Sequence, residues 1–132
     1  NDLERIGDLA VNISRKAKAL AAESPTAIPF DLASMSEKTQ AMLRDSLDAM
    51  VNLDAKLADE VCGRDEEINR MKREARLQVE EMIASDPSRT NILLRLVAVS
   101  RNLERIAALA TNIAEDVIYM VNGEIVRHQE RD

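Results

Sequence analysis

Two acidic side chains near the start of the chain have the spacing of metal ligands. Glu4 and Asp8 are four residues apart, so on a helix they lie one turn apart on the same face. Two carboxylates at that spacing can share a hard cation, whose oxygen ligands lie at about 2.0–2.6 Å. A single helix forms only one wall of such a site, and a neighbouring helix or water must complete it. Solvation of an ordinary charged helix face explains the same pair without a metal.

The sequence around this pair occurs a second time. Residues 2–13 read DLERIGDLAVNI and residues 102–113 read NLERIAALATNI. A repeat at this separation predicts a duplicated helical unit. Glu104 keeps the first acid of the pair in the second copy, but Ala108 replaces the second acid. The second copy therefore predicts a weaker site, with Glu104 as its remaining ligand.

Three further residues have side chains that could take part in chemistry. Asp45 and Asp48 lie on the polar side of a predicted helix, where they either add ligands facing the last helix or are simply solvated. Cys62 is the only cysteine, so the chain has no disulfide framework and a reducing cytoplasm is the expected location. A lone cysteine beside Gly63 is more typical of a small packed residue than of a nucleophile.

The composition argues against several classes of protein and favours an all-α fold. The net charge of −6 argues against nucleic acid as a partner, since phosphate binding needs clustered Lys and Arg. No apolar run approaches the roughly 20 residues of a membrane-spanning helix. Hydrophobic residues make up 45% of the chain but aromatic residues only 2%, with three Gly and three Pro. This composition is typical of long helices packed on one another.

Apolar side chains at alternating spacings of three and four residues predict four long helices. The first ends near Glu23, because the residue before Pro25 is pushed out of the α region. Residues 24–30 are expected to form an elbow. The second helix begins near Asp31 or at a capping box that starts at Ser34.

The remaining helix ends are predicted from Gly and Pro. Gly63 is expected to close the second helix in a left-handed conformation, and the third helix then covers residues 65–84. The fourth is expected to begin with Asp86 as its N-cap and Pro87 as its first residue. Asn122 and the following Gly123 are expected to interrupt it, so its thirty or so residues would be about 45–50 Å long.

Long helices joined by short loops pack up and down at shallow crossing angles. We expect residues 31–132 to form a three-helix bundle. Residues 1–24 are interpreted as the last helix of a truncated first bundle, because the chain begins inside a helical phrase. The apolar stripe of that helix must be covered by the bundle, by a second copy of the chain, or by both. A homodimer is therefore expected.

Several phrases of the chain resemble the PhoU family of bacterial phosphate-transport accessory and regulatory proteins. They are DLERIGD at residues 2–8, NLERI at residues 102–106, NIAE at residues 112–115 and GEIVRH at residues 123–128. The resemblance extends over essentially the whole chain. It implies tandem three-helix bundles, commonly dimeric, that repress the phosphate-starvation response through a phosphate-sensing histidine kinase and the ATPase subunit of a phosphate ABC transporter. Contact with the membrane would be only indirect, through these partners.

The resemblance also bears on the acidic residues. The family carries an acidic-xxx-Asp motif in each bundle, which can hold metal clusters on the bundle surface. Glu4 and Asp8 match the first motif, so a divalent or trivalent metal ion is expected there. The second motif departs from the pattern at Ala108, and Asn69 stands where the family often has an acid. We therefore expect a metal site on the first bundle, with Glu104 as the remnant of a lost or weakened second site.

Two alternative functions belong to other classes of protein. One is the cytoplasmic PhoU-like domain of a sodium–phosphate cotransporter, whose membrane part would precede Asn1. The other is a carboxylate-bridged metalloenzyme on a helical bundle, which needs Glu-xx-His pairs pointing inward. The single histidine, His128, lies near the chain end and argues against it. Because the sequence offers no nucleophile–base pair and no glycine-rich phosphate loop, we expect a non-enzymatic adaptor that acts through protein–protein contact.

Overall fold

The fold is an up-and-down bundle of long α-helices, as the sequence predicts. A computed structural model describes residues 2–23 and 31–131, and no strand occurs in these ranges. The elbow predicted for residues 24–30 lies outside the described residues. The elements are α1 (Asp2–Glu23), α2 (Leu32–Asn52), α3 (Ala55–Ser85), the short 3₁₀ helix η1 (Pro87–Arg89) and α4 (Thr90–Arg131).

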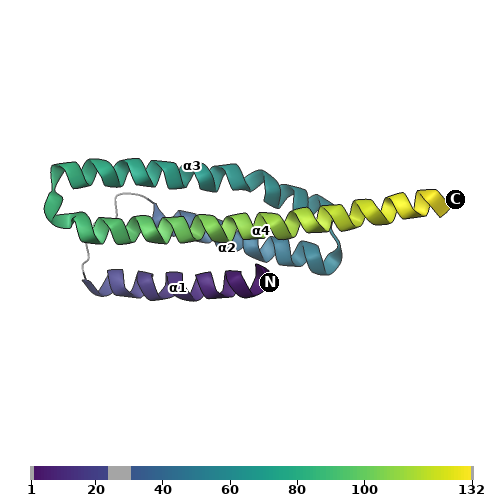
Figure 1. The fold of residues 1–132 in the computed structure, drawn as a ribbon, viewed down its shortest axis with the longest axis horizontal. Helices are drawn as coiled ribbons and strands as arrows, with labels where there is room; N and C mark the ends of the chain where they lie inside the picture. The colour runs from purple at the N-terminus through teal and green to yellow at the C-terminus, as the bar shows by residue number, and fades with distance from the viewer. Residues whose placement is uncertain (1, 24–30, 132) are drawn as a thin grey trace.

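Helix α4 is the element on which the other three helices pack. It contacts α1, α2 and α3. Figure 1 shows α4 between α3 on one side and α1 on the other, with α2 behind it. Its 42 residues correspond to about 63 Å, so the C-terminal part of α4 projects beyond the ends of its neighbours (Figure 1).

The main core lies between α2, α3 and α4 and consists almost entirely of aliphatic and small side chains. Its fully buried members include Met42 of α2, Val61 of α3 and Val99 of α4. These residues come from the apolar stripes of the three helices, so the predicted three-helix bundle is confirmed. Alanines at 107, 110 and 114 are also fully buried in this core, where their small side chains allow close approach of the helix axes.

Helix α1 packs on the bundle through a second, smaller cluster. Ile6 of α1 is buried together with Ile106, Leu109 and Ile113 of α4. Partly buried residues of α2, including Leu43, pack against the same cluster. The part of the α1 apolar stripe that the structure describes, at Ile6, Leu9 and Ile13, is therefore covered within the chain and does not require a second copy.

The break between α2 and α3 lies ten residues before the position predicted from the sequence. Leu53 takes the left-handed conformation, with φ 49°, and the N–H of Asp54 donates to the carbonyl of Ala49 at 2.9 Å. The Asp54 carboxylate then accepts from the N–H of Leu57 at 3.0 Å, which caps α3. The predicted break at Gly63 is wrong, because α3 continues through it without a positive φ.

The start of α2 is the first of the two predicted positions. Asp31, rather than the capping box at Ser34, caps α2, since its carboxylate accepts from the Ser34 N–H at 2.9 Å. Gly123 does not interrupt α4, which continues to Arg131. The predicted cap at Asp86 is confirmed: its side chain accepts from the N–H of Ser88, and the proline that follows begins η1.

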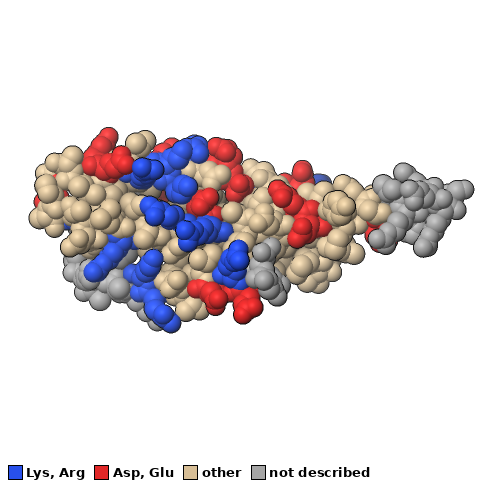
Figure 2. All heavy atoms as spheres, viewed as in Figure 1, with Lys and Arg blue, Asp and Glu red and all other residues tan. Residues whose placement is uncertain are grey.

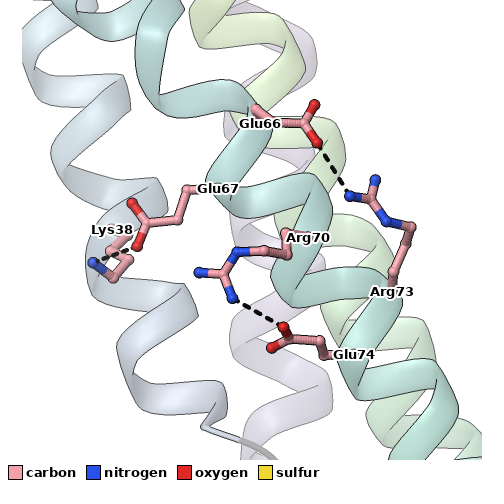
Figure 3. A network of polar contacts seen from close by, with 6 residues as sticks. All are labelled: Lys38, Glu66, Glu67, Arg70, Arg73 and Glu74. Atoms are coloured by element: carbon pink, nitrogen blue, oxygen red, sulfur yellow. Dashed lines mark hydrogen bonds and ion pairs between the residues drawn. The ribbon is translucent and has the colours of Figure 1, made fainter.

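Ion pairs on the outer surface join α2 to α3 and successive turns of α3 (Figure 3). Lys38 of α2 lies 3.0 Å from Glu67 of α3, and both side chains are 43% exposed. Arg70–Glu74 and Arg73–Glu66 pair along α3. Exposed pairs of this kind stabilise a fold by only about 0–1 kcal/mol each, so burial of the apolar stripes holds the bundle together.

Replacing Gly63 by alanine should stabilise the protein by about 1 kcal/mol, since glycine is a poor residue in a helix interior. A Cβ at this position meets no atom within 4 Å. Leu53→Gly should also stabilise the fold, because glycine adopts the left-handed conformation at no steric cost. Urea unfolding measures both changes. If Gly63→Ala destabilised the protein, the result would contradict a continuous α3 and would support the helix break predicted at Gly63.

Candidate functional site

The first acidic pair lies on the exposed surface of α1. Glu4 and Asp8 are both solvent-exposed, and neither forms an ion pair with another described residue. One turn of α1 separates them, so the predicted two-carboxylate geometry is present. Such a pair offers two oxygen ligands to a cation, and water would supply the others.

Glu104 of the second motif lies in a different environment. Its carboxylate is 4.0 Å from the Lys72 ammonium of α3, and its side chain is 23% exposed. Ala108, one turn further along α4, supplies no ligand. Glu104 therefore faces a cation on α3, and as a single carboxylate it offers a metal ion fewer ligands than the pair on α1.

The predicted metal ligands are not gathered into one centre. Glu104 faces α3, whereas Glu4 and Asp8 belong to α1, on the other side of α4 (Figure 1). Across residues 2–23 and 31–131, no group of three or more His, Cys, Asp or Glu side chains is placed to hold a metal ion.

The acids of α2 do not add to this pair. Asp45 accepts a hydrogen bond from Arg64 of α3 at 2.8 Å, so it faces α3, which neither of the two alternatives, ligands facing α4 or simple solvation, had predicted. Asp48 is exposed, in line with ordinary solvation. The side chain of His128 lies outside the described residues.

Cys62 lies half-buried on α3, next to a group of acids that sequence reasoning did not connect with it. Burial raises the pKa of the Cys62 thiol, and the negative charges of Glu115, Asp59 and Asp65 raise this pKa further. The thiol therefore stays protonated at neutral pH, as expected for a packed cysteine and not for a nucleophile. The influence of Glu115 also shows that this part of α4 lies beside Cys62.

The family of the chain is decided by comparison with known proteins. The model of the PhoU domain matches residues 32–117, which lie in α2, α3 and α4. This chain belongs to the PhoU family. The expected resemblance is thereby confirmed.

Individual relatives agree with this assignment. The phosphate-specific transport system accessory protein PhoU homolog of Clostridium acetobutylicum is 35% identical over 95% of this chain and 57% of its own length. The homolog from Pseudomonas putida is 38% identical over 96% of this chain and 50% of its own length. The crystal structure of PhoU from Pseudomonas aeruginosa superposes with a TM-score of 0.85 at 35% identity, covering 92% of this chain and 59% of that chain. The PhoU-family chain thus spans little more than half the length of these relatives.

Within the two described ranges, no helix combines the length and the apolar character that crossing a bilayer requires.

Alkylation of Cys62 by iodoacetamide should follow a pH curve whose midpoint lies above that of free cysteine, because only the thiolate reacts. Glu115→Gln should lower the midpoint by removing a negative charge that disfavours the thiolate. Glu81→Gln, an exposed change elsewhere on α3, serves as the control and should leave the midpoint in place. A wild-type midpoint at or below that of free cysteine would show that Cys62 is an activated thiol.

Proposed function

We propose that this chain belongs to a regulator of phosphate uptake and of the phosphate-starvation response. In this role it acts as an adaptor on a phosphate transporter and its sensor kinase. The observation that carries the proposal is the match of the PhoU domain over α2, α3 and α4. The names of its relatives, accessory proteins of phosphate-specific transport systems, support the same role.

The proposed mechanism is contact rather than catalysis. Long helices packed along α4 present rigid faces, which suit docking with little ordering cost. Several side chains that could take part in catalysis have structural surroundings instead. Asp45 and Glu104 lie in ion pairs. Burial and neighbouring acids keep the Cys62 thiol protonated. A non-enzymatic role in the cytoplasm, with partners that are the phosphate-sensing histidine kinase and the ATPase subunit of a phosphate ABC transporter, follows from this reading.

A metal ion forms a second part of the proposal. Glu4 and Asp8, exposed and without a described ion-pair partner, would hold a divalent or trivalent cation through one oxygen ligand each. The bound charge would neutralise the acidic pair and so favour docking of an acidic partner surface. Glu104, which lies 4.0 Å from Lys72, would be the one remaining carboxylate of a weaker second site.

We further propose that the chain forms a homodimer. The apolar stripe of α1 does not support this dimer, because α4 and α2 cover the described part of the stripe. The support comes from the arrangement of charged side chains on the outer surface of α3 and α4.

A pull-down with the immobilised chain should retain both the sensor kinase and the transporter ATPase. A chelator should reduce the retained amounts, and Asp8→Ala should reduce them to a similar extent and remove the effect of the chelator. Glu60→Ala, which removes an exposed acid from α3, is the matched control and should behave as wild type. Retention of neither partner would overturn the adaptor role. If neither the chelator nor Asp8→Ala changed the amounts retained, the proposed metal site would be contradicted, but the adaptor role would not.

A further inference from the structure

The outward side of α4 carries a line of charge with opposite signs at its two ends. Arg101, Ala108 and Glu115 are spaced by seven residues, so they lie on one stripe along the helix. Arg101 and Glu115 are exposed, and Ala108 between them is half-buried. The centre of this stripe is therefore small and uncharged, with a cation and an anion at equal distances on either side.

Helix α3, which packs beside α4, also carries basic residues toward one end and acidic residues toward the other. Lys72 lies next to Glu104, and α3 and α4 run in opposite directions (Figure 1). This register places Arg76 level with Arg101. At the other end of α3, the exposed Asp59 lies near Cys62, as Glu115 does.

The two helices together form one surface, which we call the α3–α4 face and define by Asp59, Arg76, Arg101, Ala108 and Glu115. Figure 2 shows basic side chains gathered over the middle of the molecule in this view and acidic ones along α4 toward the end that projects. The overall net charge of −6 conceals this separation of charges.

The cations of this face are available to a partner. Arg101 is exposed and forms no ion pair with another described residue. Arg76 pairs with Glu80 at 3.2 Å, but these side chains are 74% and 58% exposed, so the pair is weak and easily exchanged.

We propose that the α3–α4 face is the surface through which two copies of the chain associate. A two-fold axis that passes close to Ala108 and lies across the helices would bring α4 of each copy antiparallel onto α4 of the other. Arg101 of each copy then lies opposite Glu115 of the second copy, and the pairing occurs twice. Such a face is self-complementary, as an interface with two-fold symmetry must be.

The size of the face indicates how strong this dimer is. From Asp59 to Arg76 the face is roughly 25 Å long, and two helices make it about 20 Å wide. It would bury roughly 500 Å² on each copy, or about 1,000 Å² in total, which is near the lower limit for a specific interface. The dimer should therefore be weak, concentration-dependent and sensitive to salt, because charge complementarity contributes specificity more than affinity.

This inference rests on the proposed homodimer but not on the adaptor role. An acidic protein partner would use only the basic end of the face. A second copy is favoured because Glu115 lies as far from Ala108 on one side along α4 as Arg101 does on the other.

Charge exchange between positions 101 and 115 tests the pairing directly. Arg101→Glu and Glu115→Arg should each raise the dissociation constant of the dimer by about tenfold or more, because like charges then face each other twice. The double variant R101E/E115R restores opposite charges and should recover the wild-type dissociation constant. An equimolar mixture of the two single variants should form a heterodimer. Sedimentation velocity over a range of concentrations, at low and at high salt, measures all four samples.

Arg44→Glu is the matched control, since Arg44 is exposed on α2 and the change in charge is the same. Circular dichroism checks that every variant remains folded. If the wild-type chain stayed monomeric at all concentrations, both the homodimer and this interface would be contradicted. The adaptor role would be unaffected, because the pull-down tests it separately. The proposed interface alone would be contradicted if neither single change altered the dissociation constant of the dimer. It would also be contradicted if R101E/E115R did not recover the wild-type dissociation constant.

Discussion

The structure depends on the burial of α4 by three other helices. Between Leu93 and Val117 almost every position of α4 is buried except for a single outward stripe. Ile106 and Leu109 face α1, whereas Leu103 belongs to the core shared with α2 and α3. Because three sides of α4 are covered, the fourth side is where this helix can present charged residues to a partner. Packing therefore decides which side chains of α4 are available for function.

The same constraint explains the character of the core. Among the described residues the core holds no aromatic side chain and includes small hydroxyl residues, most of which bond locally, although the buried hydroxyl of Thr39 has no hydrogen-bond partner. Thr111 and Ser100 donate to carbonyls of α4 itself, at 3.0 and 2.8 Å, and Ser46 does the same within α2 at 2.7 Å. Helices that satisfy their own buried hydroxyls need no polar network between them.

Much of the fold could be predicted from the sequence, because apolar periodicity and the Asp86–Pro87 cap are local signals. The end of α2 could not, since Leu53 takes a left-handed conformation that is rare outside glycine. Gly63 and Gly123 were misleading because both lie inside helices. The site was less predictable than the fold. Glu4 and Asp8 are exposed on one turn as predicted, but the pairing of Glu104 with Lys72 depends on the register between two helices.

Amide hydrogen exchange along α4 is the most direct test of this account, because exchange rates report how well each segment is held. If α1, α2 and α3 all pack on α4, the amides of residues 93–117 should exchange more slowly than any others in the chain. Residues 119–125, most of which are exposed, should exchange faster by at least about a hundredfold, as expected for a helix end held mainly by its own hydrogen bonds. Equal rates in the two segments would contradict the central place of α4.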